Sequence, residues 1–76
     1  MSKEIKKDMI LEWFLDQPEG FEITIRYLGK FLPQKLGITK NQLIVYLREL
    51  RSEKRINVTR YRKFNKNSYI LITYHL

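Results

Sequence analysis

Residues 39–55 have the sequence TKNQLIVYLRELRSEKR, and the rest of the chain can be placed relative to them. Thr39 and Gln42 stand at the spacing of a capping box, in which each side chain bonds the backbone amide of the other residue. This spacing predicts a helix that begins here. Apolar residues at positions i, i+3, i+4 and i+7 predict its buried face, which consists of Leu43, Tyr46, Leu47 and Leu50.

The opposite side of this helix is unusual for a surface that faces water. It has no carboxylate near its centre, and Ile44 and Val45 stand where a solvated helix usually carries Lys or Glu. Asn41 and Arg48 are residue types that read base edges through pairs of hydrogen bonds. We therefore interpret this side as the reading face of a recognition helix, made up of Asn41, Ile44, Val45, Arg48, Ser52 and Arg55.

The composition predicts one small globular domain. The chain has 76 residues, of which 43% are hydrophobic, too many for a disordered segment. It has no cysteine, so neither disulfides nor thiolate metal sites can hold it together. No apolar run reaches the roughly 18 residues that a membrane span needs, and the opening residues MSKEIKKD lack the apolar segment of a signal peptide. These features predict a cytoplasmic protein with no membrane partner.

The positive charge is confined to one half of the chain. Residues 1–38 carry six basic and six acidic side chains, whereas residues 39–76 carry nine basic and two acidic ones, so the second half holds the entire net charge of +7. A one-sided excess of this kind is typical of a surface that neutralises phosphates and releases their counterions. The alternative is a surface that only keeps a basic protein in solution. The coincidence with the recognition-like helix favours nucleic acid.

A first helix is predicted from Ser2, as its N-cap, to about Asp16. Its expected inward stripe consists of Ile5, Met9, Ile10 and Trp13. Leu11 and Leu15 lie on nearly the opposite side, so either the helix is enclosed within the domain or this side forms a dimer interface.

The next segment predicts a short edge strand, a second helix and a turn. Residues 21–23 form the strand, and Thr24 caps a helix whose buried stripe is expected to contain Ile25, Leu28, Phe31 and Leu32. Gly29 weakens this helix and predicts the close approach of another backbone. Pro33 is expected to end or bend it, and Gly37 to supply the left-handed residue of the turn before Thr39.

After residue 55 the pattern changes to a period of two and predicts a β-hairpin, residues 56–63 and 69–74 around a turn at 65–68. Its apolar base is expected to cover the helical core through Ile56, Val58, Ile70 and Ile72. Its tip gathers basic side chains around Tyr61 and Phe64, a mixture suited to a phosphate backbone or a groove. Basic residues at a tip can also serve only to prevent edge-to-edge pairing.

This order of elements resembles the winged helix-turn-helix family, an α+β class in which three helices precede a two-stranded hairpin, the wing. The resemblance covers essentially the whole chain and rests most on residues 36–39 (LGIT), 46–50 (YLREL), 54–56 (KRI) and 69–71 (YIL). It implies that the third helix enters the major groove of DNA, where Lys40, Asn41, Ile44, Val45, Arg48 and Ser52 would face bases and phosphates. It also implies wing contacts by Arg60, Arg62, Lys63 and Lys66.

The resulting expectation is a sequence-preferring double-stranded DNA-binding protein, a small transcription regulator that binds as a homodimer through Leu11 and Leu15 or through residues 74–76. Two alternatives stay open. One is a DNA-binding module for replication or partition of a plasmid or virus. The chain is rich in Lys, Asn, Ile and Tyr, a bias that indicates an A/T-rich genome, and mobile elements often have such genomes. The other is a protein-binding domain in which Ile44 and Val45, ringed by Arg48, Arg51 and Arg55, meet an acidic partner.

The residues needed for catalysis do not occur in a usable pattern. The single histidine, His75, is next to the last residue, and the three glycines are isolated, which excludes a Gly-rich phosphate loop. Carboxylates of the first helix stand at spacings that pair with lysines, as Glu4 does with Lys7, which is typical of a solvated face. The sequence therefore predicts a binding protein, not an enzyme, with no cofactor and no metal.

Overall fold

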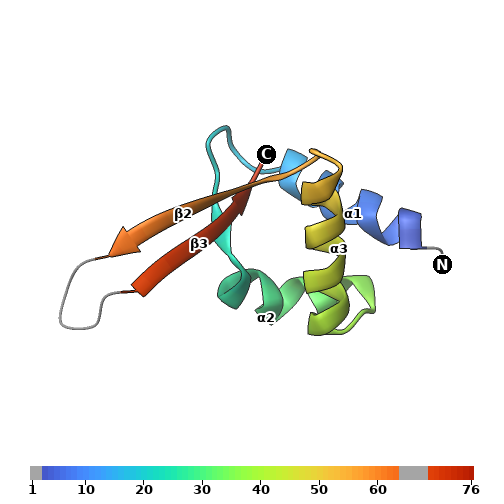
Figure 1. Ribbon diagram of the computed structural model, residues 1–76. Helices are drawn as coiled ribbons and strands as arrows, with labels where there is room; N and C mark the ends of the chain where they lie inside the picture. The colour runs from blue at the N-terminus through green and yellow to red at the C-terminus, as the bar shows by residue number, and fades with distance from the viewer. Residues whose placement is uncertain (1–2, 64–68) are drawn as a thin grey trace.

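The computed structural model describes residues 3–63 and 69–76 and shows an α+β arrangement (Figure 1). In chain order the elements are α1 (Lys3–Leu15), β1 (Ile23–Thr24), α2 (Ile25–Leu36), α3 (Lys40–Ser52), β2 (Asn57–Lys63) and β3 (Tyr69–His75). Within the described residues these make three helices and one three-stranded antiparallel sheet of strand order β1-β3-β2. The predicted order of elements is confirmed.

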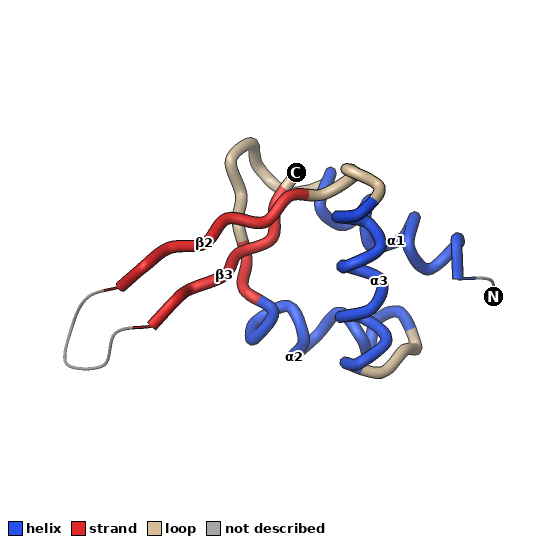
Figure 2. Tube along the Cα trace, in the orientation of Figure 1, coloured by secondary structure: helices blue, strands red, loops and turns tan. Residues whose placement is uncertain are grey.

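The sheet is a hairpin to which β1 adds a short edge. β2 and β3 pair along their whole length, from Asn57 opposite His75 to Lys63 opposite Tyr69. β1 pairs with β3 only at its two residues, so most of the hairpin projects away from the helices (Figure 2). Tyr74 is paired on both sides, with Ile23 and with Val58, so the predicted dimer surface at residues 74–76 has no free strand edge at this position.

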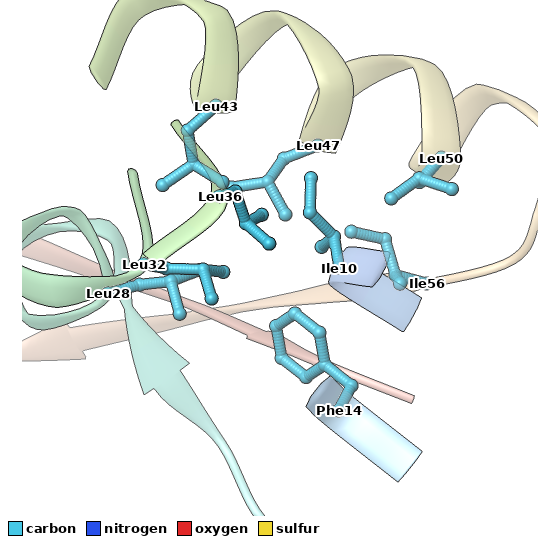
Figure 3. Packing of buried hydrophobic residues seen from close by; sticks show 9 residues of the cluster. All are labelled: Ile10, Phe14, Leu28, Leu32, Leu36, Leu43, Leu47, Leu50 and Ile56. Carbon is cyan, nitrogen blue, oxygen red and sulfur yellow. The ribbon is translucent and has the colours of Figure 1, made fainter. Parts of the chain in front are cut away.

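The core is formed where the three helices meet the start of β2 (Figure 3). α3 contributes three leucines at the predicted spacing, and Figure 3 shows them pointing toward the leucines of α2 and toward Ile10. Tyr46, the fourth predicted member, is only partly buried against this cluster. The buried hydrophobic residues of the described chain are Ile10, Phe14, Leu28, Leu32, Leu36, Leu43, Leu47, Leu50 and Ile56.

The predicted inward stripe of α1 is confirmed in part. Ile10 is buried, and Met9 and Trp13 pack partly buried against the core, as predicted. Ile5 is exposed, and the helix buries Lys7 and Phe14 instead. Trp13 lies at the margin of the core, where its ring packs against Phe14 at 5.1 Å between centroids and also against rings of α2 and of the α1–β1 loop. Lys7 was missed because a lysine counts as polar in a pattern of apolar residues, although its stem can be buried when its ammonium finds a partner.

Lys7 is buried as an ion pair and does not belong to a solvated face as expected. Only 1% of its side chain is exposed, and its ammonium bonds the carboxylate of Glu53 and lies 3.5 Å from that of Glu4. The hydrogen bond to Glu53 raises the pKa of Lys7, and the same bond lowers the pKa of Glu53. Because Glu53 is the C-cap of α3, this pair attaches α1 to the point where α3 ends.

This pair predicts a loss of stability at both extremes of pH. Since the pKa of Glu53 is lowered, its contribution is complete above the ordinary value of 4.5 and is lost as pH falls through the lowered pKa. The pKa of Lys7 is raised, so its contribution is complete below 10.5 and is lost as pH rises through the raised pKa. Thermal unfolding followed by circular dichroism should therefore show a plateau in Tm between about pH 5 and 10.

Two variants test the pair. Glu53→Gln should lower Tm on the plateau, because it leaves a buried ammonium beside a neutral amide. Lys7→Met should lower Tm less, or raise it, because an apolar side chain of similar length fills the same space. Equal losses of Tm in the two variants would contradict a buried, partnered Lys7.

α2 continues past Pro33, so of the two predicted effects of this proline, ending the helix or bending it, the first is wrong. Pro33 cannot donate to the carbonyl of Gly29, yet the helix extends to Leu36. It is closed by Gly37, whose backbone is left-handed with φ 68°, and by the Ile38 N–H, which donates to the Pro33 carbonyl at 2.9 Å. The left-handed turn at Gly37 was predicted and is confirmed, while the helix before it is three residues longer than expected.

Candidate nucleic-acid interface

The proposed reading face of α3 lies at the surface. The capping box is present: the Thr39 N–H donates to Gln42 Oε1 at 2.9 Å, and the Gln42 N–H donates to Thr39 Oγ1 at 3.1 Å. This box fixes the first turn, so the outward positions follow from the helical repeat. The side chains of Asn41, Val45, Arg48 and Ser52 are exposed, and that of Ile44 is partly buried.

One face of the hairpin turns its side chains toward the same region. The register places Arg60 opposite Ile72 and Arg62 opposite Ile70, so basic and apolar residues are cross-strand neighbours. Ile70 is 55% exposed, and Ile72 is exposed as well. The prediction that these two isoleucines cover the core is wrong, because the hairpin reaches beyond the helices. Ile56, just before β2, is fully buried as predicted, and Val58 is partly buried.

A groove joins α3 to this face of the hairpin. It has a volume of about 230 Å³ and is lined by Arg48, Arg51, Val58, Arg60, Ile72 and Tyr74. We call it the α3–hairpin groove. A shallow hollow next to it on α3 is lined by Arg48, Arg51 and Ser52. Arg48 lines both depressions and therefore connects the outward face of α3 to the groove. The lining combines three guanidinium groups with an apolar floor and contains no carboxylate.

The acidic residues of the second half of the chain are turned away from this groove. Glu49 pairs with Lys3, and Glu53 pairs with Lys7, both on α1. Within the described part of the chain, no carboxylate lies within 4.0 Å of the side-chain nitrogens of Arg48, Arg51, Arg60 or Arg62. The charge separation seen in the sequence is therefore also a separation in space.

Two residues that were predicted to contact DNA do not lie as expected on the outward stripe of α3. Arg55 donates to Asp8 at 3.0 Å and to Glu53 at 3.4 Å, and its pKa is raised, chiefly by the bond to Asp8. Lys40 lies across Gly29 of α2 instead of along the outward stripe of α3. The structure adds Arg51, which was predicted only for the protein-binding alternative. Its spacing of three residues from Arg48 could have indicated it.

Of the remaining predicted residues, some lie on the described surface and others lie outside the residues that the structure describes. Arg60 and Arg62 are exposed on β2. Lys66 and the side chain of Lys63 lie outside the described residues. Leu15 is 67% exposed, whereas Leu11 packs partly against the core, so the predicted dimer interface on α1 consists of one accessible leucine and one largely occupied one.

The opposite face of the hairpin is tied to the loop before β1. Glu22 accepts hydrogen bonds from the Tyr61 hydroxyl at 2.7 and 2.9 Å and from the Thr73 hydroxyl at 3.0 Å. The bond from Tyr61 is the main cause of the lowered pKa of Glu22, and it raises the pKa of Tyr61. These bonds hold the hairpin at a fixed angle, so that its arginine-bearing face stays turned toward α3.

The connection from α3 to β2 also fixes this angle. The N–H of Arg55 donates to the Leu50 carbonyl and that of Lys54 donates to the Arg51 carbonyl, both at 2.9 Å, which is the Schellman pattern of a helix end. Lys54 takes the left-handed position with φ 62°, where glycine is usual. The chain therefore leaves α3 in a defined direction, and Ile56 enters the core directly afterwards.

Comparisons with protein-family models, with curated proteins and with solved structures find no match to this chain. Across residues 3–63 and 69–76, no helix has both the length and the apolar character needed to cross a bilayer. The same residues contain no group of three or more His, Cys, Asp or Glu side chains placed to hold a metal ion.

Proposed function

We propose that this chain is a winged helix that binds double-stranded DNA with a sequence preference. The observation that carries the proposal is the α3–hairpin groove, where Arg48, Arg51 and Arg60 surround an apolar floor and, among the described residues, have no carboxylate partner. Guanidinium groups bind phosphate through paired N–H donors, and an apolar floor suits the sugar between two phosphates. A polyanionic strand satisfies both features at once.

In this proposal α3 lies in the major groove. Arg48 contacts a guanine or a phosphate, Asn41 an adenine near the start of the helix, and Val45 the methyl group of a thymine. One strand of the duplex then leaves the major groove through the α3–hairpin groove, between Arg51 and Arg60. The hairpin, with Arg62, follows the adjacent backbone or minor groove. The reading residues and the phosphate-binding residues thus occupy two neighbouring parts of one surface.

The test is a titration of a labelled random-sequence duplex at two salt concentrations. With about six phosphate contacts, affinity should fall roughly a thousandfold between 50 and 200 mM salt. Lys35→Ala is the control for non-specific effects of removing one positive charge. Lys35 is an exposed lysine of α2 that lies beside α1 and outside the proposed interface, so its replacement should leave the affinity for DNA unchanged. Absence of any binding at low salt would remove the proposal.

The exposed isoleucines favour a second candidate, a protein-binding domain that meets an acidic partner through the hairpin and not, as first predicted, through Ile44 and Val45. Ile70 and Ile72 stand beside Arg62 and Arg60, a combination that also fits an extended acidic segment with apolar side chains. This candidate predicts saturable binding of acidic peptides that contain Leu or Ile, and none of the random duplex. The same titration, repeated with such a peptide, separates the two.

We further propose that the protein acts as a small transcription regulator and binds as a homodimer, since one helix in one groove reads too few bases for a selective site. The exposed Leu15, the last residue of α1, supports an interface on this helix. Sedimentation should give a dimer on the duplex, and Leu15→Glu should convert it to a monomer. A monomer both free and bound in the wild-type protein would contradict this.

A further inference from the structure

Gly29 of α2 lies under the side chain of Lys40, the first residue of α3. A Cβ atom added to Gly29 would lie 3.0 Å from Cε of Lys40 and 3.4 Å from its Cδ and Cγ. The aliphatic stem of Lys40 therefore lies flat over Gly29. Close approach at this glycine was predicted for another backbone, but a lysine side chain makes it.

A glycine at this position makes α2 less stable than an alanine would. Gly29 stands in the interior of the helix with ordinary helical neighbours, where alanine is the better helix former. The atoms that a methyl group would meet belong to the far part of a flexible side chain, which can move away. An alanine could therefore be accepted by the fold, and the main change would be the displacement of Lys40.

The surroundings of Gly29 are cationic. α2 contains no acidic residue, and Arg26 and Lys30, both exposed, stand three residues before and one residue after Gly29. The ammonium of Lys30 lies 5.2 Å from the centre of the Tyr27 ring. Lys40, laid across Gly29, adds a third basic side chain next to the first turn of α3, which carries Asn41 of the reading face.

We infer that Gly29 is a positioning residue for a phosphate contact made by Lys40. The inference rests on the proposed function and adds α2 to the DNA-binding surface. A lysine stem held against α2 before binding loses less side-chain freedom when its ammonium meets a phosphate. Gly29 thus increases affinity through Lys40 without touching DNA itself.

The experiment is a double-mutant cycle of the full chain: wild type, Gly29→Ala, Lys40→Met and the double variant. Fluorescence anisotropy with a labelled duplex at several salt concentrations gives Kd and its salt dependence. Gly29→Ala should weaken binding about two- to tenfold with an unchanged salt slope, since no charge is lost. Lys40→Met should weaken binding and reduce the slope by about one. The double variant should match Lys40→Met.

Thermal unfolding separates positioning from a defect in folding. Gly29→Ala should raise Tm by about 4 to 8 °C because helix propensity improves, so stability and affinity should move in opposite directions. The inference is overturned by unchanged affinity of Gly29→Ala, by an equal loss in the Lys40→Met background, or by a lower Tm. In those cases binding by the wild type still supports the proposed function. If the wild type does not bind duplex, the proposed function fails and the inference falls with it.

Discussion

Arg48→Ala should weaken binding to a selected duplex by about 1 to 3 kcal/mol and broaden the range of sequences that are selected. Arg48 lines both the hollow on α3 and the α3–hairpin groove, and the described residues place no carboxylate against it. Its guanidinium is therefore available to a base edge or a phosphate at the junction of the two depressions. Selection from a random duplex pool, followed by anisotropy with selected and scrambled duplexes, measures both effects.

Arg62→Ala is the matched control for Arg48→Ala. Arg62 is an exposed arginine on β2, away from the reading face of α3. Its removal should weaken binding to all sequences alike and reduce the salt slope by about one. If Arg48→Ala behaves in the same way as Arg62→Ala and keeps the wild-type preference, then Arg48 contacts only the backbone, and the reading residue must be sought among Asn41, Val45 and Ser52.

Leu47→Ala should reduce the free energy of unfolding by about 2 to 5 kcal/mol. Leu47 is 0% exposed and stands in the middle of the core between the leucines of α2 and Ile10 (Figure 3). This loss is a large fraction of the total free energy of unfolding, because a small domain with a core of this size is only marginally stable. Urea denaturation followed by circular dichroism measures it.

Val45→Ala on the same helix provides the comparison for Leu47→Ala. Val45 is 49% exposed, and alanine is the better helix former, so stability should change by less than about 0.5 kcal/mol. Any effect of Val45→Ala should instead appear in the preference for thymine-containing sites. Similar losses of stability in the two variants would mean that α3 is rotated relative to the core described above.

The features that local chemistry determines could be predicted from the sequence. The capping box at Thr39, the leucine stripe of α3 and the left-handed Gly37 all follow from residues within one or two turns of each other. The burial of Lys7 on α1 could not, because its ammonium pairs with a carboxylate 46 residues away. The exposure of Ile70 and Ile72 also depends on how far the hairpin extends beyond the helices. The alternation of residues along a strand does not indicate that distance.

The same division applies to the candidate site. The helical repeat was sufficient to place Asn41, Val45 and Arg48 at the surface. It could not show that Arg55 is held by Asp8 or that Lys40 is drawn across α2, because both partners are distant in the chain. The groove itself depends on the angle between α3 and the hairpin, which Glu22 and the turn at Lys54 set.

The pairing of Glu49 and Glu53 with lysines of α1 has a consequence for the proposed binding of DNA. Among the described residues, Arg48, Arg51 and Arg60 line the α3–hairpin groove with no carboxylate within 4.0 Å, so positive charge is concentrated on that side of the molecule. The field of a polyanion turns such a positive side toward itself before any atoms touch. Under the proposed function the protein would therefore approach a duplex with this side first, and the rate of association should fall as added salt shortens the range of the attraction.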